Sequence, residues 1–310
     1  MSAAWVAASV RVRALAAGRA GEQGALRIAS AQTWTEVEDL LSRWSYGVRA
    51  AHVSGPEALQ RAARETLLWQ LRVLAGWVPA SGTGILRAAA ARFEREDILQ
   101  HRRELEGGQA TSPYELGALE TSWGLLRTAA SATALTHLLA RTAWGEVPDD
   151  DDPQLADILT AASLVRYAQV APAARTWCTR ECALAVARLL FVDRVRPGPT
   201  LRTRAAPLLG HAWESAPDLP SFVAALPRRV GTMLGGITVP GDLWRAEARL
   251  HALMEAEAGA MLRDGTPRPD VVVAGIALLS ADAWRVQAAL AATGAAGESH
   301  GAREVLDVAS

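Results

Sequence analysis

The segment Arg92–Gly108, with the sequence RFEREDILQHRRELEGG, carries side chains that could bind a metal or exchange protons. In a helix, Glu94, Asp97, His101 and Glu104 fall on one stripe, because they are three or four residues apart. Carboxylates beside an imidazole are the residue set of a metal site or an acid–base pair. A metal site, however, needs three or four converging ligands, usually from more than one helix. The other histidines are scattered, so we interpret the stripe as part of a structural helix.

Four consecutive aspartates, Asp149–Asp152, invite comparison with the aspartate-rich magnesium motif of helical terpene synthases. Those enzymes need a second magnesium motif, with Asn and Ser, on another helix, and this chain contains no Asn. Pro148 and Pro153 bracket the acidic run, which favours a solvated loop whose last aspartate caps the next helix. An all-α magnesium-dependent enzyme that uses these aspartates stays open as an alternative function.

Two other motifs could carry chemistry. Cys178 and Cys182 are four residues apart and share a helix face. Without two further ligands nearby they are a weak zinc signal, so we expect two packed, reduced thiols, as in a cytoplasmic protein. The glycine clusters at Gly82–Gly84 and Gly231–Gly236 lack the strand–turn–helix context of a nucleotide loop. We expect turns there, and neither a cofactor nor a metal.

The composition is that of a soluble globular protein: 310 residues, 50% hydrophobic and 21% charged, with a net charge of −1. This balance gives no support to a nucleic-acid partner. Every basic side chain is Arg, and the absence of Lys excludes a phosphate-loop or Schiff-base lysine. The N-terminal arginines follow an apolar run, the reverse of a secretion signal. The apolar run Val271–Leu279 is too short to span a bilayer, so we expect no direct membrane span.

The elements that must position these residues are helices, because helical periodicity dominates the chain. Alternating strand patterns are scarce, and the only β-branched triplet, Val271–Val273, leads straight into another helical pattern. Breaks rich in glycine and proline separate the runs. The predicted fold class is all-α, with helices of roughly one to two dozen residues. The main amphipathic runs are Leu67–Leu74, Leu125–Leu139 and Leu243–Met254.

The chain also contains internal repeats. LLSRWSYG (Leu40–Gly47) closely matches LLARTAWG (Leu138–Gly145), and each is followed by a helical signature, FEREDILQHRREL and CTRECALAVARLLFVDRVRPG. A more divergent third copy combines Pro220–Gly231 with Ser280–Gly297. These units predict three divergent helical repeats, at residues 1–110, 111–200 and 201–310, that form one continuous, funnel-like body.

Taken in order, four stretches resemble the C-type central-stalk component of the archaeal and bacterial V-type ATPase, which is equivalent to the d-type component of the vacuolar enzyme. Val10–Gly21 resembles the N-terminal Arg-x-Arg helix of that family, and EDLLSRWSYG resembles its aromatic corner. RFEREDILQHRRELEGG resembles an acid-rich helix that ends in Arg and Gly, and Trp284–Val308 resembles the C-terminal helix and corner. The chain departs from the family at Asp97, where relatives carry Asn, and at His101 and Arg102, where they tend to carry leucines.

The resemblance implies a non-catalytic rotor part with no catalysis of its own. Such a subunit caps the cytoplasmic mouth of the membrane ring and receives the tip of the central shaft, so that torque passes between ATP chemistry and the transport of protons or sodium ions. It implies central-shaft subunits and the membrane rotor ring as partners, and a cytoplasmic location peripheral to the plasma membrane. A free-standing helical adaptor is a further alternative. The expected interface residues are Arg11, Arg13, Glu94, Asp97, Arg102 and Arg103.

Overall fold

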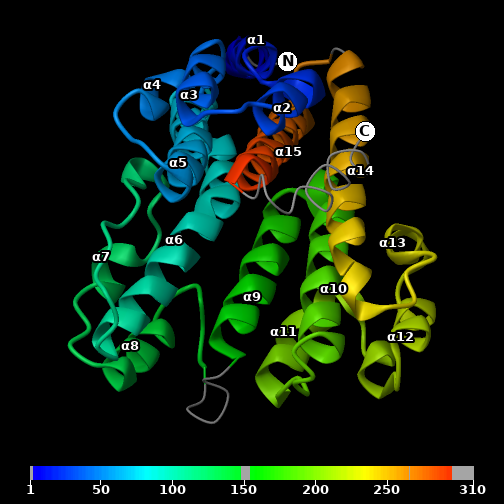
Figure 1. Cartoon of the computed structure of the whole chain (residues 1–310). Helices are drawn as coiled ribbons and strands as arrows, with labels where there is room; N and C mark the ends of the chain where they lie inside the picture. Colours follow the sequence, from blue (N-terminus) through cyan, green and yellow to red (C-terminus); the bar gives the residue numbers. More distant parts are fainter. Residues whose placement is uncertain (1–2, 148–153, 265, 295–310) are drawn as a thin grey trace. The chain divides into compact units, whose positions relative to one another are not determined.

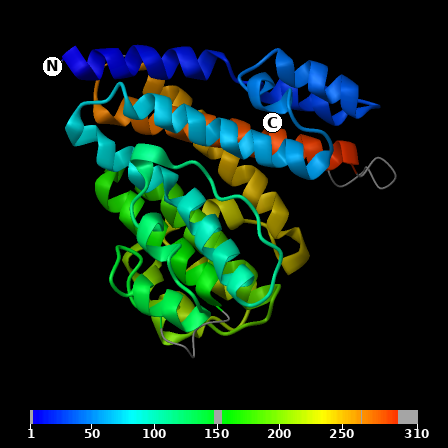
Figure 2. The same ribbon diagram turned by 90° about the vertical axis from the view of Figure 1, so that its left-hand side faces the viewer.

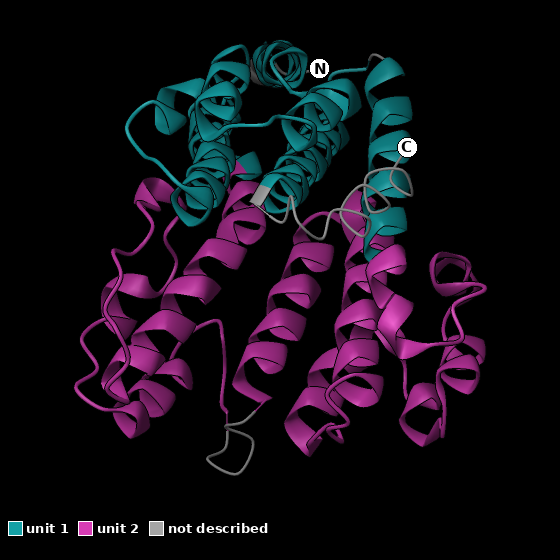
Figure 3. Ribbon diagram, in the orientation of Figure 1, with its two compact units in different colours: residues 1–82, 247–310 teal, residues 83–246 magenta. Residues whose placement is uncertain are grey.

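The computed structural model describes residues 3–147, 154–264 and 266–294. Every regular element in these ranges is an α-helix or a short 3-10 helix, and none of these residues belongs to a strand (Figure 1). The predicted all-α class is therefore confirmed. The chain divides into two compact units (Figure 3): residues 1–82 together with 247–310 form unit 1, and residues 83–246 form unit 2.

Unit 1 is assembled around its last helix, α15 (Pro269–Gly294), which packs against helices from the start of the chain. Figure 2 shows α1, α5 and α15 as long rods lying side by side. Besides α15, the unit contains α1 (Ala3–Ala17), α2 (Gly21–Ala29), α3 (Trp34–Ser42), α4 (Gly47–Ala50), α5 (Pro56–Ala75), the 3-10 turn η1 (Ala80–Gly82) and the later part of α14 (Leu243–Arg263).

Helix α15 is the core helix of unit 1, because every side chain from Val271 to Ala283 is buried. Gly275 approaches α1 so closely that a Cβ there would overlap the side chain of Val12. The short apolar run of the sequence thus belongs to a helix of 26 residues. By length and composition Pro269–Thr293 could cross a bilayer, but 83% of its most apolar window is buried. Such burial is what the core helix of a globular unit shows.

Unit 2 is arranged around α9 (Leu155–Val170), which packs against α6, α10 and α11. Its core includes an aromatic chain in which Phe222 makes edge contacts with Phe191 and Trp213. Its elements are α6 (Thr83–Leu105), η2 (Gly117–Leu119), α7 (Trp123–Leu126), α8 (Ala132–Leu139), α9, η4 (Pro172–Ala174), α10 (Arg175–Phe191), α11 (Pro199–Leu209), η5 (Ala212–Ser215), α12 (Leu219–Ala225), α13 (Arg228–Leu234), η6 (Pro240–Asp242) and the start of α14.

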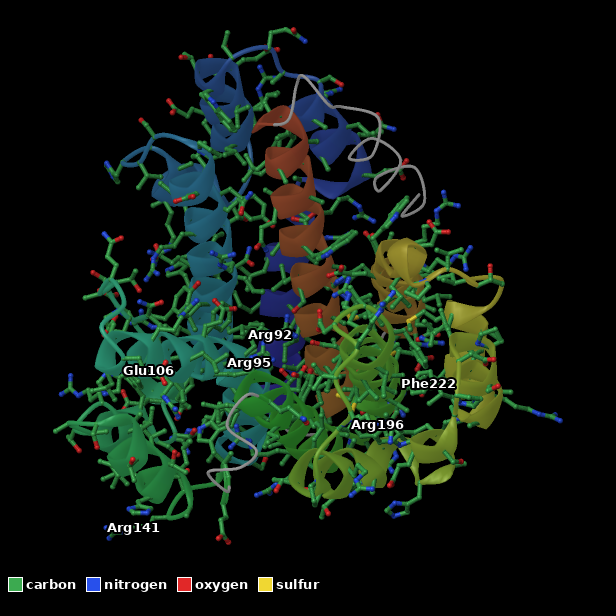
Figure 4. All side chains as sticks on the ribbon, turned by 60° about the horizontal axis from the view of Figure 1, so that its bottom comes forward. Arg92, Arg95, Glu106, Arg141, Arg196 and Phe222 are labelled. Carbon is green, nitrogen blue, oxygen red and sulfur yellow. The ribbon has the colours of Figure 1, made fainter. Side chains whose placement is uncertain are left out.

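Three short helices, α3, α8 and α12, have a common register: their N-cap residue and their buried residues recur at the same spacing. Each begins at a side-chain N-cap, where Thr33, Ser131 or Asp218 accepts a hydrogen bond from the backbone N–H three residues later. The residue four positions after the cap is fully buried in all three helices: Val37, Leu135 and Phe222, the last labelled in Figure 4. Eight positions after the cap, at or next to the last residue of the helix, each has a buried leucine: Leu41, Leu139 and Leu226.

Several sequence expectations need correction. The expected boundary positions 110 and 200 both fall inside unit 2, and unit 1 joins the two ends of the chain, because α15 packs on α1, α2 and α5. Helices shorter than a dozen residues are common, down to four residues in α4 and α7. The glycine clusters are only partly turns: α6 begins at Thr83, and Gly231 lies inside α13.

Candidate functional site

The polar stripe of α6 (Glu94, Asp97, His101 and Glu104) contacts the backbone of the segment that follows this helix. Asp97, which is buried, accepts the backbone N–H of Tyr114 at 3.0 Å. Glu94 is 1% exposed and accepts the backbone N–H groups of Thr121 at 3.0 Å and Ser122 at 2.6 Å, at the start of α7. A carboxylate is a favourable cap there, because the first N–H groups of a helix have no partner inside it.

The other two members of the stripe, which lie nearer the end of α6, also contact backbone groups of the following segment. His101 Nε2 lies 3.2 Å from the carbonyl oxygen of Ala129, and Glu104 accepts the backbone N–H of Thr111 at 2.8 Å. The hydrogen bond from Thr111 lowers the pKa of Glu104. The four side chains therefore bind successive points of residues 111–129 and do not converge on one point. Among the described residues there is no group of three His, Cys, Asp or Glu side chains that could hold a metal.

We call the repeated segments LLSRWSYG and LLARTAWG the corners of unit 1 and unit 2. The corner of unit 2 is hydrogen-bonded to Glu94. Trp144, in LLARTAWG, is fully buried, and its Nε1 lies 3.4 Å from Glu94 Oε1. The next residue, Gly145, has a φ of +77°, and a Cβ there would overlap the guanidinium of Arg204. Position 145 therefore requires glycine both for its backbone conformation and for the close approach of Arg204.

The corner of unit 1 has a matching anchor. Tyr46, in LLSRWSYG, donates its hydroxyl hydrogen to Asp282 of α15 at 2.7 Å. Asp282 is 1% exposed and also accepts the backbone N–H groups of Ala20 at 3.1 Å and Gly21 at 2.7 Å, at the start of α2. Burial raises the pKa of Asp282 and, together with the charge of Asp282, that of Tyr46. In each unit, then, a buried acid caps a helix and binds the aromatic residue of the corner.

The remaining residues of the unit 1 corner dock on the turn between α1 and α2. Ser45 bonds to the carbonyl oxygen of Gly18 through both its backbone N–H, at 3.1 Å, and its hydroxyl, at 3.0 Å. Trp44 covers Gly24 so closely that a Cβ at position 24 would lie 2.8 Å from its ring. The Trp-Ser-Tyr sequence thus fixes α2, α4 and α15 to one another.

A network of ion pairs joins the turn after α1 to α14 and α15 in unit 1. Glu255 of α14 accepts hydrogen bonds from Arg19 at 2.8 Å and from Arg285 of α15 at 2.6 Å. Burial by itself would raise the pKa of Glu255, but the hydrogen bond and charge of Arg285, followed by those of Arg19, lower it below its ordinary value. The network ties the turn after α1 to both C-terminal helices.

Unit 2 contains a pocket that sequence reasoning missed and that is lined by two arginines. Its volume is about 530 Å³, and it lies between α9, α11 and the corner after α8. Arg166 of α9 lines it and stacks over the ring of Trp144, with the guanidinium carbon 4.6 Å from the ring centroid. Burial lowers the pKa of Arg166, and the charge of Glu94 acts in the opposite direction. In the sequence Arg166 is an ordinary helical arginine, and only the structure shows that its neighbours Ser163, Leu164, Tyr167 and Ala168 are buried.

The six expected interface residues are not all at the surface. Glu94 and Asp97 are buried within unit 2 and bind its backbone, so they present no interface, and that expectation is wrong for these two acids. In the same unit Arg103 is exposed, and Arg102 pairs with Glu106 at 2.6 Å; Figure 4 labels Glu106.

In unit 1 the two expected arginines lie on α1 and are partly buried. Arg11 lies over the ring of Trp77, with 5.9 Å between the guanidinium carbon and the centroid. Arg13 donates a hydrogen bond to the carbonyl oxygen of Leu262 at 3.1 Å. Both arginines therefore have roles inside unit 1, and their remaining exposed surface borders an apolar stripe on the same helix.

That stripe consists of Val6, Val10 and Ala14, which lie at steps of four residues along α1. Val10 is 63% exposed. Beyond Ala14 the stripe leads to an apolar pocket of about 580 Å³, whose walls include the exposed side chains of Val48 and Trp69. Contiguous exposed apolar surface of this kind is typical of an interaction face.

The cysteines, one histidine and the acidic run are the remaining candidates from the sequence. Cys178 and Cys182 are free and buried, as predicted, and burial raises the pKa of both thiols. His211 is not isolated, although the histidines appear scattered in the sequence, because it lies 2.6 Å from Glu214, three residues later. The acidic run Asp149–Asp152 lies outside the described residues.

No family model and no curated protein matches this chain. A proposal of function therefore depends on the residues and on the arrangement described above.

Proposed function

We propose that this chain is a non-catalytic central-stalk subunit of a rotary V-type ATPase or ATP synthase. In this role it would be the socket between the membrane ring and the central shaft, and it would transmit torque for the transport of protons or sodium ions. The observation that carries the proposal is the common register of α3, α8 and α12. Three helices with the same cap and the same buried positions are what three divergent copies of one unit would retain.

The anchoring of the first two corners supports the same interpretation. Tyr46 and Trp144 occupy the same place in the two repeated sequences, and each binds a buried acid that also caps a helix. The acids come from α15 and α6, two of the helices that contain parts of the resemblance to the V-type ATPase family. Matching contacts at equivalent positions favour duplication over chance similarity of two short sequences.

The use of the polar residues supports a non-catalytic role. Glu94, Asp97 and Asp282 bind backbone N–H groups, so their oxygens are engaged in holding loops and helix ends. A rotor part needs rigid internal connections of this kind, and it needs a broad face for its partners. The stripe of Val6, Val10 and Ala14, bordered by Arg11 and Arg13, offers such a face, because contiguous exposed apolar surface marks interaction sites and arginine is a preferred interface anchor.

Co-purification tests the proposal. The tagged full-length chain would be expressed in its own host, and its complexes would be isolated after mild solubilisation of the membranes. We expect the shaft subunits and the membrane-ring subunit in the eluate. Recovery of the chain alone, from membranes whose ring and shaft still co-purify with each other, would show that it is not the socket.

A pair of variants sharpens this test. Val10→Glu places a charge on the exposed stripe, and Val239→Glu places one at another position with 57% exposure. Neither change should alter the unfolding temperature by more than a few degrees, because both sites are at the surface. We expect Val10→Glu to lose shaft or ring subunits while Val239→Glu retains them. Equal retention by both variants would remove the α1 stripe from the interface.

A further inference from the structure

Arg166 is a buried cation for which the described residues provide no acceptor. Its Nε, Nη1 and Nη2 atoms are all buried and have no hydrogen-bond partner in that part of the chain. The acid whose charge reaches it, Glu94, already accepts bonds from Thr121, Ser122 and Trp144. Stacking on the Trp144 ring offsets part of the cost of burying the charge. The N–H donors of the guanidinium nevertheless remain costly without an acceptor.

A second arginine lines the same pocket. Arg204 of α11 lines the pocket and approaches Gly145, the residue next to Trp144. Its one hydrogen bond among the described residues is long, 3.4 Å to the carbonyl oxygen of Glu146. Glu146 also lines the pocket, and the bond that it makes to Arg204 comes from its backbone. The wall of the pocket therefore carries two arginines and one acid, Glu146, which leaves an excess of positive charge.

Two uncharged polar side chains of the wall can donate hydrogen bonds to an oxyanion. Thr203 of α11 offers a hydroxyl, and Gln169 of α9 offers an amide. A volume of about 530 Å³ is in the range of small-molecule sites. Guanidinium groups bind phosphate and carboxylate oxygens in pairs of parallel hydrogen bonds. We propose that this pocket binds a small oxyanionic molecule, most simply through a phosphate group, with Arg166 and Arg204 as its charged contacts. Because the Arg166 nitrogens are buried beside the Trp144 ring, the Arg166 side chain has to turn toward the molecule that binds.

The proposal is independent of the rotor function, and inorganic phosphate is the probe. The full-length protein would be titrated with phosphate at constant ionic strength, against chloride, by calorimetry and by thermal unfolding. We expect saturable binding and a rise in the unfolding temperature that chloride does not produce. A parallel titration with acetate identifies the group: protection by acetate but not phosphate would assign the same site to a carboxylate. The absence of saturable protection by either anion would overturn the proposal.

Three variants locate the binding. Arg166→Met approximates the length of the side chain and removes the donors, and we expect it to weaken binding by roughly tenfold or more. Arg204→Gln, at a less buried position, should weaken it severalfold. Arg127→Met removes an exposed arginine outside the pocket and should bind as the wild type does.

The stability of the first variant provides a second readout. Without phosphate, Arg166→Met should be at least as stable as the wild type, because it removes a buried cation that has no acceptor among the described residues. With phosphate, only the wild type should gain stability. Unchanged phosphate binding in both Arg166→Met and Arg204→Gln would contradict the assignment of these arginines and of the pocket.

Discussion

Glu94 and Asp282 are the buried acids on which the two corners depend. Each accepts two backbone N–H groups at the start of a helix and one bond from an aromatic side chain. The positive end of the helix dipole and the N–H groups stabilise a carboxylate there. Removal of such an acid leaves buried donors without an acceptor, which costs more than the bond itself contributes.

Glu94→Ala should therefore destabilise the protein strongly. We expect a loss of about 3 kcal/mol in the free energy of unfolding, because four donors lose their acceptor: the backbone N–H and hydroxyl of Thr121, the N–H of Ser122 and the Nε1–H of Trp144. Glu106→Ala, at an exposed acid just beyond the end of the same helix, should change it by less than about 0.5 kcal/mol. Denaturant unfolding of the two variants measures the difference. Similar values for both would mean that the cap at α7 is not needed for stability.

A pair of glycines separates backbone strain from crowding. Gly21 and Gly145 both have positive φ, at +63° and +77°, but only a Cβ at position 145 would meet another group, the guanidinium of Arg204. Gly21→Ala should cost about 1 kcal/mol for the left-handed backbone. Gly145→Ala should cost more, about 2–3 kcal/mol, since Arg204 must also move. Thermal unfolding of the two proteins tests the order, and a smaller loss for Gly145→Ala would contradict the close approach.

The sequence predicted the polarity of the α6 stripe but not its partners. Glu94, Asp97, His101 and Glu104 stand at helical spacing, which is visible in the sequence. Their partners lie in residues 111–129, a segment without long periodicity, so nothing in the pattern connects a given acid to a given backbone N–H. Arg166 was missed for a related reason: one arginine in a helix is ordinary until the residues around it are known to be buried.

At the scale of elements, the long helices were predictable and the short ones were partly so. The leucines of α5 and the apolar positions of α14 recur at helical steps, and both helices form there. The caps of α3 and α8 precede the repeated sequences LLSRWSYG and LLARTAWG. The positions of the two corners could therefore be predicted from these repeats. The placement of α15 against α1, α2 and α5 depends on contacts between residues about 200 or more positions apart, which local periodicity does not report.

The ion network of unit 1 should make stability depend on pH in the acid range. Glu255 has a pKa below its ordinary value of 4.5, so its charged form stabilises the folded state. This contribution is fully present above that value and is lost as the pH falls through the lower, folded-state pKa. We expect the wild type to exceed Glu255→Gln in stability by a constant margin above about pH 5.5. The margin should shrink as the pH falls below 4.5.

Denaturant unfolding at a series of pH values from neutrality to about pH 3 measures that margin. Asp264→Asn is the matched control, because Asp264 is an exposed acid just after the same helix and pairs with Arg268. Its margin should be small at every pH. A margin for Glu255→Gln that does not change with pH would mean that Arg19 and Arg285 stabilise α14 by packing alone.

At the scale of the whole molecule, unit 2 is one continuous segment, whereas unit 1 is assembled from both ends of the chain. We expect residues 83–246 to fold when produced alone, because this segment contains its own core, including Trp213 and Phe222. Residues 1–82 alone should remain largely unfolded, because α1, α2 and α5 bury their apolar faces against α15.

Circular dichroism and thermal melting of the two fragments test this expectation. The 83–246 fragment should be helical and unfold cooperatively, and the 1–82 fragment should show a weak helical signal without a cooperative transition. Addition of a peptide that covers α14 and α15 should restore structure to the shorter fragment. A cooperative transition in 1–82 without that peptide would show that α15 is not required.

The position of α15 at the end of the described chain also matters during synthesis. A ribosome adds about 5–20 residues per second. The apolar faces of α1, α2 and α5 therefore stay uncovered for roughly 10–40 seconds, until α15 has been synthesised. Unit 2 is synthesised completely within that interval and can fold first. The beginning of the chain is thus the last part to reach its native state, and in the meantime it offers a nascent-chain chaperone a hydrophobic surface to hold.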